Sequence, residues 1–358
     1  MEPDENGFWH PNIDEGICIN CGLCEKFCPI LKEYKGNAKG KAYACINKNE
    51  EIRRQSSSGG IFTLLAENVI ARGGVVFGAA FDEKFAVRHI AVEQTKDLDK
   101  LRGSKYLQSY IGDAYTHAKS FLESGRLVLF SGTPCQISGL KAYLGKEYDN
   151  LIMQDIICHG VPSPKVWQKY VDFRQKSADA QAQKIEFRNK RYGWQDYSLL
   201  LEFENGEEYI KTSSKDPYMR AFLTNLCLRE SCYDCHSKSL ERESDITLAD
   251  FWGIKGVLPD MDDDKGTSLI LVNSKKGESV FEEIKEDMVY EEVDIDIVAR
   301  RNTAACKSVA YNKSRSSFLK QIFEKNFEKT VEKYCKTKYI RRILSKIKKI
   351  IKAKILKK

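Results

Sequence analysis

Twelve cysteines dominate the chemistry that this 358-residue sequence can support. Four of them have the spacing C-x2-C-x2-C-x3-C in "CINCGLCEKFCP", at Cys18, Cys21, Cys24 and Cys28. This spacing is typical of bacterial ferredoxin segments that bind a 4Fe-4S cluster. Zinc is the alternative metal, since C-x2-C pairs also bind zinc. We predict iron–sulfur chemistry here, because the three-step run that ends in Cys-Pro is the more specific pattern.

The fourth cysteine of this run raises a question about ligands. In two-cluster ferredoxins it binds the other cluster, and we find no second run upstream. The segment "DENGFWHPNIDEGICINCGLCEKFCP" resembles the second half of a two-cluster ferredoxin domain. We expect either that the true start lies before Met1 or that this variant has lost the first half, and we favour the first explanation. Cys45 is a weaker substitute ligand, because "KAYACINKN" is typical of a strand.

A second group of cysteines lies far downstream in "CLRESCYDCHSK". Cys232 and Cys235 form a C-x2-C pair, and Cys227 precedes the pair by five residues. A pair of this kind needs further ligands from elsewhere in the fold. One hypothesis is a zinc-stabilised scaffold that uses Cys227, Cys232, Cys235 and His236.

Two isolated cysteines are further candidates for that site. Cys135 lies in "LVLFSGTPCQISGL", at the turn from a predicted buried strand into a helix, where the helix dipole favours a thiolate. Cys158 lies in "DIICHGVPSP", at the end of the next predicted strand. Open α/β folds place their sites where the carboxyl ends of parallel strands meet. The sequence therefore predicts that both thiols share one sheet edge; the alternative is that each is a buried packing residue.

A loop of small residues predicts contact with a phosphate-bearing redox cofactor. The sequence "SSSGG" directly precedes a predicted helix, where free backbone N–H groups and serine hydroxyls can hold an anion. The alternative is a linker with an ordinary helix cap. The candidate residues are Ser57, Ser58, Gly59 and Gly60.

A second loop, "LRGSKYLQS", combines a cation and an aromatic ring with small residues. Beside a flavin, the cation would stabilise the reduced anion and the ring would stack on the isoalloxazine. Taken alone, the segment is equally consistent with a capped loop. The candidate residues are Gly103, Ser104, Lys105, Tyr106 and Gln108.

Alternating strand and helix patterns must position these residues. Residues 47–60 look like a polar connector, and residues 182–212 like an antiparallel meander. We predict an α/β fold with a mixed sheet and helices on its faces, plus a small cysteine-rich ferredoxin-like N-terminal segment. Strands are expected at 75–81, 86–92, 127–132, 151–158 and 245–251, helices at 61–74, 112–126, 133–145, 163–176 and 216–226, a strand–helix–strand unit at 268–292, and an amphipathic helix at 314–334.

Taken in order, these motifs resemble the coenzyme F420 hydrogenase/dehydrogenase beta-subunit family. The resemblance runs through "SSSGGIFTLLAENVIARGGVVFGAAF", "LRGSKYLQS", "LVLFSGTPCQISGLKAYLG", "DIICHGVPSPKVW" and "LRESCYDCHSKSLERESDITLADFWGI". It implies an FAD- and 4Fe-4S-dependent oxidoreductase that passes electrons between ferredoxin-type clusters, FAD and an acceptor, either coenzyme F420 or another carrier. One departure is Ala249-Asp250, where the family often has Gly-Asp.

By position, the resemblance assigns four cluster ligands and leaves Cys227 as a packing residue. The two loops, together with Thr133, match the flavin region. The ligands implied are Cys135, Cys158, Cys232 and Cys235. A redox partner protein or ferredoxin is implied as well. The alternative is a non-catalytic electron-relay or assembly subunit that binds clusters but not flavin.

These assignments divide the chain into four parts. Residues 1–45 form a partial ferredoxin-type segment, and residues 46–130 form the N-terminal flavin-binding part. Residues 131–312 form the C-terminal iron–sulfur and flavin part, and residues 313–358 form a helical basic tail.

The charge of the chain is concentrated in that tail. The last 18 residues carry nine of the Lys and Arg side chains, and without them the net charge falls from +7 to −2. A near-neutral body argues against nucleic-acid binding. In the tail, apolar side chains recur at helical spacing, which predicts contact with an anionic membrane surface; a solvated helix or a partner-docking helix is the alternative. These residues are Ile340, Ile343, Leu344, Ile347, Ile350 and Ile351.

The predicted cellular location rests on two kinds of segment that we do not find in the sequence. No signal peptide is recognisable, and no stretch approaches the roughly 20 apolar residues that span a bilayer. We therefore predict a cytoplasmic protein, with peripheral contact on the inner face of the cell membrane if the tail binds there.

Overall fold

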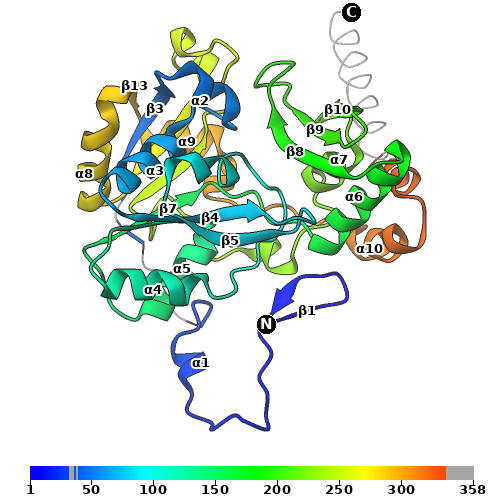
Figure 1. Ribbon diagram of the computed structural model, residues 1–358, viewed down its shortest axis with the longest axis horizontal. Helices are drawn as coiled ribbons and strands as arrows, with labels where there is room; N and C mark the ends of the chain where they lie inside the picture. The colour runs from blue at the N-terminus through cyan, green and yellow to red at the C-terminus, as the bar shows by residue number, and fades with distance from the viewer. Residues whose placement is uncertain (32–35, 38, 336–358) are drawn as a thin grey trace, which may run out of the picture.

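The computed structural model describes residues 1–31, 36–37 and 39–335. Its centre is an eight-stranded mixed sheet with the strand order β13-β3-β12-β11-β7-β6-β4-β5 (Figure 1). The strands β4, β6, β7 and β11 pair in parallel, and the remaining pairs are antiparallel. The bounds are β3 Lys41–Asn47, β4 Val75–Phe81, β5 Val87–Val92, β6 Val128–Gly132, β7 Leu151–Ile156, β11 Ile246–Asp250, β12 Ser268–Val272 and β13 Met288–Val293.

Helices cover both faces of this sheet because its strands alternate their buried side chains. Val76 and Leu129 pack with α3 (Ile61–Ala71) and α8 (Lys275–Ile284) on one face. Phe77 and Phe130 pack with α4 (Ala114–Glu123) and α5 (Pro134–Leu144) on the other. Successive residues of a strand point to opposite faces, so a fully apolar strand requires cover on both sides. The predicted fold class, a mixed sheet with helical cover, is confirmed.

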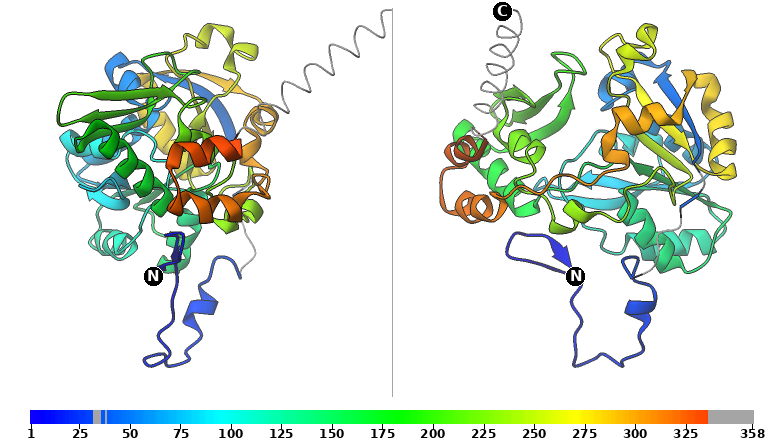
Figure 2. Two further views of the ribbon diagram at one scale, coloured as in Figure 1. Left: turned by 90° about the vertical axis from the view of Figure 1, so that its right-hand side faces the viewer. Right: turned by 180° about the vertical axis from the view of Figure 1, so that it is seen from behind.

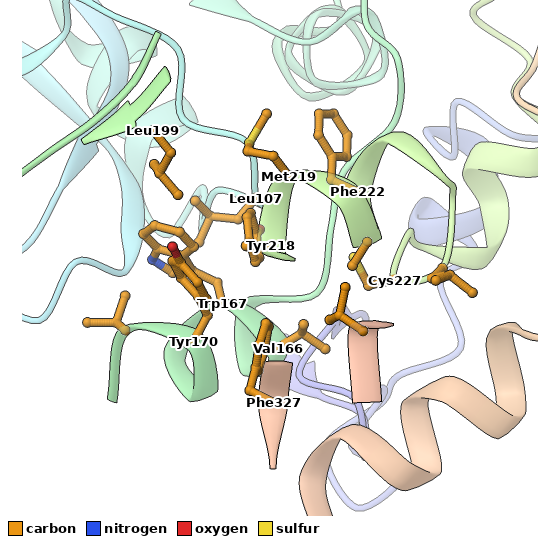
Figure 3. Close-up of a cluster of buried hydrophobic side chains, with 14 of the residues drawn as sticks. Leu107, Val166, Trp167, Tyr170, Leu199, Tyr218, Met219, Phe222, Cys227 and Phe327 are labelled. Atoms are coloured by element: carbon orange, nitrogen blue, oxygen red, sulfur yellow. The ribbon is translucent and has the colours of Figure 1, made fainter. Parts of the chain in front are cut away.

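A second packed layer lies beside the sheet and is built around the predicted meander (Figure 1). Its strands are β8 (Ala182–Asn189), β9 (Ser198–Phe203) and β10 (Glu208–Thr212), paired in antiparallel order. Helices α6 (Pro164–Ala178), α7 (Pro217–Leu223) and α10 (Arg315–Glu324) pack against it. Aromatic rings fill this core, and Figure 3 shows Trp167, Tyr170 and Tyr218 packed among aliphatic side chains.

Two expected segments differ from what we predicted. Residues 314–334 do not form one helix, because α10 ends at Glu324 and helical backbone resumes only at residue 327. There Asn326 accepts a hydrogen bond from the backbone N of Lys329 at 3.1 Å and so caps a new helix. The connector at 47–60 contains a helix, α2 (Glu50–Gln55), whose first N–H groups bond to the side chain of Asn49. Side-chain caps, rather than apolar periodicity, set both boundaries.

The N-terminal segment extends away from the body of the molecule after its first ten residues (Figure 2). Two short strands, β1 (Glu2–Pro3) and β2 (Trp9–His10), pair as a hairpin, and a single turn, α1 (Leu23–Lys26), follows. The segment then enters the sheet through β3, which contains residue 45, where our division of the chain falls. That division remains a prediction.

No helix within residues 1–31, 36–37 and 39–335 is long and apolar enough to cross a membrane. The predicted amphipathic tail, from Ile340 to Ile351, lies outside the described residues.

Candidate functional site

Four cysteines from three distant segments meet at the carboxyl edge of the central sheet. Cys135 is the second residue of α5, directly after β6, and Cys158 follows β7 by two residues. Cys232 lies in the 3-10 turn Glu230–Asp234, and Cys235 ends that turn. Each thiol interacts electrostatically with the other three. We call these four residues the cysteine tetrad.

Crowding makes the tetrad difficult to ionise without a compensating cation. Burial, followed by the neighbouring Cys232 and Cys135, raises the pKa of Cys158 to about 12. Burial likewise raises the pKa of Cys232 to about 11. Cys135 remains accessible on one side, yet the surrounding protein raises its pKa as well. Metals bind thiolates, so a set of crowded thiols fits a cationic metal group that offsets their charge.

Hydrogen bonds to sulfur hold two members of the tetrad. The backbone N–H of Val161 donates to Cys232 Sγ at 3.4 Å, and Thr133 Oγ1 lies 3.2 Å from Cys135 Sγ. Gly160 has a φ of 149°, and a Cβ there would lie 3.2 Å from the Cβ of Cys232. The loop after β7 therefore approaches Cys232 through a residue without a side chain, as metal-binding loops often require.

Two cations that we did not select from the sequence flank the tetrad. Arg229 opposes the rise in the pKa that burial causes at Cys135 and Cys232, and Lys238 does the same at Cys158. Lys238 Nζ also donates to the backbone oxygens of Cys158 and Ala304. Both cations lie within three residues of the C-x2-C pair, which is the signal that could have identified them.

The four residues of the zinc scaffold differ in burial. Within the part of the chain that the structure describes, no three His, Cys, Asp or Glu side chains are arranged around one metal ion. Cys227 is fully buried in the aromatic core, against which Cys232 also packs, and it interacts electrostatically with Cys335. His236 is exposed. The zinc scaffold that includes Cys227 remains a prediction.

The N-terminal cysteines are arranged differently from the tetrad. Cys18, Cys21 and Cys24 are exposed, and Cys28 is partly exposed. Cys45, considered as a substitute ligand, is buried within β3, where burial raises its pKa well above the usual range. We call Cys18, Cys21, Cys24 and Cys28 the cysteine run; its role as a cluster site remains a prediction.

The two loops predicted to contact flavin lie against each other. Ser57 Oγ accepts hydrogen bonds from the backbone N of Ser104 at 2.8 Å and from Ser104 Oγ at 2.9 Å. Ser58 Oγ donates to the backbone oxygen of Thr267, and Gly60 begins α3 with a φ of 85°. Hydrogen bonds thus hold together two loops that are 47 residues apart in the sequence.

Other loop residues are engaged within the protein. Lys105 Nζ donates to three carbonyl oxygens, those of Lys100, Leu101 and Arg102, at 2.9 to 3.0 Å. Burial lowers the pKa of Lys105 to about 7, while these three acceptors favour its charged form. The ring of Tyr106 stacks on Phe222 with centroids 5.0 Å apart. Direct flavin contacts by these two side chains remain predictions.

The remaining candidates connect the loops to other elements. Thr133 is the N-cap of α5, and Gln108 Oε1 accepts a hydrogen bond from the backbone N of Trp9 at 2.9 Å. Gly103 has a φ of 84°, with open space where a side chain would project. Gly59 donates its backbone N–H to Ser268 Oγ at 2.9 Å.

A buried ion pair that sequence reasoning missed joins the meander to the loops. Arg188 Nη1 and Nη2 contact the two carboxylate oxygens of Asp250 at 2.6 and 3.0 Å, and Arg188 Nη1 donates to the hydroxyl of Tyr106 at 3.1 Å. Trp194 Nε1 donates to the same carboxylate at 2.9 Å. Lys190 Nζ, two residues after Arg188, donates to the backbone oxygen of Ser58 at 2.7 Å. No local pattern linked these residues, because their partners come from distant segments.

Two surface hollows of the molecule lie away from the tetrad and the two loops. Two hollows, of about 530 Å³ and 250 Å³, lie between α6 and β8 and beside β5. Neither is lined by a tetrad residue or by a residue of the two loops. The chemistry of this edge is therefore inferred from side-chain geometry.

Comparisons with known proteins identify relatives of the region that holds the tetrad. Residues 125–297 match the family model for the C terminus of the coenzyme F420 hydrogenase/dehydrogenase beta subunit. Thirteen chains of solved structures match, among them a chain of the F420-reducing [NiFe] hydrogenase complex from Methanosarcina barkeri. That match has 17% sequence identity and a TM-score of 0.52, and it covers 82% of this chain and 96% of the other, so it shows a shared fold. A search of the curated proteins finds no match.

Proposed function

We propose that this chain, whose residues 125–297 match the family model for the C terminus of the coenzyme F420 hydrogenase/dehydrogenase beta subunit, is an iron–sulfur flavoprotein oxidoreductase. In this proposal the tetrad holds a 4Fe-4S cluster, and the joined loops at 57–60 and 103–108 hold FAD. The electron acceptor is coenzyme F420 or another carrier. We also propose a redox partner protein, because the similar solved chain is part of a hydrogenase complex.

The convergence of the four tetrad thiols carries this proposal. They come from the start of α5, the loop after β7 and the turn near residue 232, and all six pairs interact electrostatically. A cluster bound there would supply one-electron transfer, and FAD would exchange one or two electrons. Convergence from separate segments at a sheet edge is expected of a built site rather than of packing cysteines.

The chain's own residues have defined tasks around such a cluster. The backbone N–H of Val161 and the hydroxyl of Thr133 lie within hydrogen-bond distance of two sulfurs. Arg229 and Lys238 place positive charge beside the four thiolates. Hydrogen bonds and charges of this kind tune the potential of an iron–sulfur site.

Metal and flavin content test the proposal directly. Anaerobic reconstitution with iron, sulfide and FAD should give a coloured protein with the broad visible absorbance of a cluster and the separate bands of a flavin. Iron, sulfide and flavin are then counted per chain after gel filtration. A colourless, iron-free protein would contradict the proposal.

One observation favours the second candidate, a relay or assembly subunit without flavin. Ser57 Oγ already accepts two protein donors, and Lys105 Nζ already has three protein acceptors. If these groups stay engaged, the loops offer fewer polar contacts to FAD. Iron without flavin in the reconstituted protein would identify this candidate.

A further inference from the structure

The N-terminal arm, residues 2–10, is fixed against the body although the segment after it extends away. Phe8 is only 1% exposed. Lys165 Nζ donates to the backbone oxygen of Glu5 at 2.8 Å. Gly7 has a φ of 83° and lies so close to Lys165 that a Cβ would be 2.8 Å from the Cβ of that lysine. The arm is therefore seated on the start of α6.

Arg229 holds the end of this arm. Its Nη1 donates to the backbone oxygen of Trp9 at 2.6 Å, and its Nη2 lies 3.2 Å from His10 Nδ1. The backbone N of Trp9 in turn donates to Gln108, and the Trp9 ring lies 4.5 Å from that of Tyr110. Charge-assisted hydrogen bonds are about twice as strong as neutral ones, so the guanidinium is a principal contact of the arm.

The backbone of Arg229 forms hydrogen bonds with Val161 and with Cys232 of the tetrad. The N–H of Arg229 donates to the oxygen of Val161 at 2.9 Å, and the N–H of Cys232 donates to the oxygen of Arg229 at 3.0 Å. The N–H of Val161 donates to Cys232 Sγ, so hydrogen bonds link Arg229, Val161 and Cys232 in a closed ring. The side chain of Arg229 also opposes the burial that raises the pKa of Cys135 and Cys232. One residue therefore touches both the arm and the tetrad.

We propose that Arg229 couples the N-terminal arm to the redox state of the tetrad. This inference rests on the proposed function and assigns Arg229 as a positioning residue. Four thiolates around an iron–sulfur cube leave a net negative charge, which grows on reduction, so a nearby guanidinium favours the reduced state and raises the reduction potential. Because coupling between sites is reciprocal, negative charge at the tetrad also holds Arg229, and with it the arm, more firmly.

Two neighbouring lysines allow the two halves of this coupling to be separated. Lys165 contacts the arm at Glu5 and is not among the largest influences on the tetrad thiols. Lys238 contacts the backbone of Cys158 and Ala304, and no contact with the arm is described for it. Arg229→Gln removes both an arm contact and a charge beside the tetrad. Lys165→Met removes an arm contact, together with a cation–π contact to Phe323. Lys238→Met removes a charge beside the tetrad, together with the hydrogen bonds to Cys158 and Ala304, but no described arm contact.

Two measurements test the coupling on the full chain. Hydrogen exchange at the amides of residues 5–10, measured on metal-free protein, should be about 10-fold faster or more in R229Q and K165M but unchanged in K238M. A redox titration followed by EPR, on protein reconstituted with iron and sulfide, should show a more negative potential in R229Q and K238M but not in K165M. The matched charge-preserving variant, Arg229→Lys, should retain most of the potential while losing the paired contact to Trp9 and His10.

Each result decides between the proposals. R229Q with an unchanged potential, or with an unchanged exchange rate in the arm, overturns the coupling while leaving the oxidoreductase proposal standing. A protein that loads no iron overturns both, and the iron count alone identifies that case. Faster exchange in R229Q together with a more negative potential supports the coupling.

Discussion

The cysteine run and the cysteine tetrad use the same side chain in opposite settings. The run lies on a segment whose only helix is one turn long with no buried residue, and Ile19 within it is 84% exposed. The tetrad is anchored by β6, α5 and β7, and Val161 donates to one of its sulfurs. Cysteine spacing therefore marks where a metal site can form, whereas surrounding packing decides how firmly the ligands are held.

Exposed apolar side chains around the run strengthen this contrast. Six large side chains there are at least half exposed, whereas Ile137 and Leu228, close to the tetrad, are fully buried. They are Ile13, Ile17, Ile19, Leu23, Ile30 and Leu31. Apolar surface of this kind is typical of a segment that packs against another element when it functions.

The largest expected effect comes from removing one thiol of each group. Cys158→Ser should lower the iron bound per chain at the body site about 10-fold or more, because the remaining three thiols cannot complete a four-cysteine site. Cys21→Ser should leave that iron unchanged. Iron and sulfide are counted after anaerobic reconstitution of each variant.

Cys306→Ser is the matched control for that experiment. Cys306 lies between Ala304, which accepts from Lys238, and Ser308, which accepts from the N–H of Cys235, yet it is outside the tetrad. Its substitution should therefore leave iron content at the wild-type level. Iron lost from Cys21→Ser and kept in Cys158→Ser would reverse the comparison between the two groups.

Acid should weaken the body through a histidine beside the tetrad edge. His89 lies in β5, where its ring nitrogens face Ser109 Oγ at 2.7 Å and the backbone oxygen of Ser131 at 3.0 Å, and burial lowers its pKa from 6.5 to about 4. The unfolded chain takes up this proton at higher pH than the folded chain, so stability is lost as pH falls from 6.5 toward 4. The full loss is about 3 kcal/mol.

Urea unfolding of wild type and His89→Gln at a series of pH values isolates this contribution. The free energy of unfolding of the wild type, relative to that of His89→Gln, should decrease as pH falls through that range. Other titrating groups are shared by both proteins and cancel in the difference. Parallel pH profiles would show that His89 does not titrate as a buried histidine.

The smallest expected effect is the difference in stability between alanine substitutions at two glycines, Gly160 near the tetrad and Gly22 in the run. Gly160→Ala should lower the free energy of unfolding by about 1–3 kcal/mol, because its φ of 149° disfavours a side chain and a Cβ would press on Leu228 and Cys232. Gly22→Ala, in the run, has a φ of 68° but no atom within 4 Å of the added Cβ. Its strain should be confined to a segment that contributes little to the cooperative core.

Denaturant unfolding of these two variants measures the difference. The control is the midpoint of the wild-type transition under the same conditions. Equal destabilisation by both substitutions would mean that the run unfolds together with the body, contrary to the contrast drawn above.

Much of the framework could be predicted from local sequence. Buried strands such as β6 and the helix α5 that follows it were recognisable from apolar runs, turn residues and a proline at the first helical position. Placing Cys135 and Cys158 after consecutive parallel strands was enough to predict a shared edge, and β6 and β7 do pair in parallel. The helix break at 325–326 was missed, because the apolar period continues across it while the cap of Asn326 interrupts the backbone.

By itself, then, the sequence determined most of the strand and helix order, the cysteine spacings and the match of residues 125–297 to the family model. Only the tertiary structure decided that Arg229 contacts the arm, that Arg188 pairs with Asp250, and that Cys227 turns into the core while Cys232 turns toward Cys135. The physical reason is the separation along the chain of the residues that interact. Periodicity and capping depend on neighbours within a few residues, whereas these contacts depend on how distant segments pack across a complete sheet.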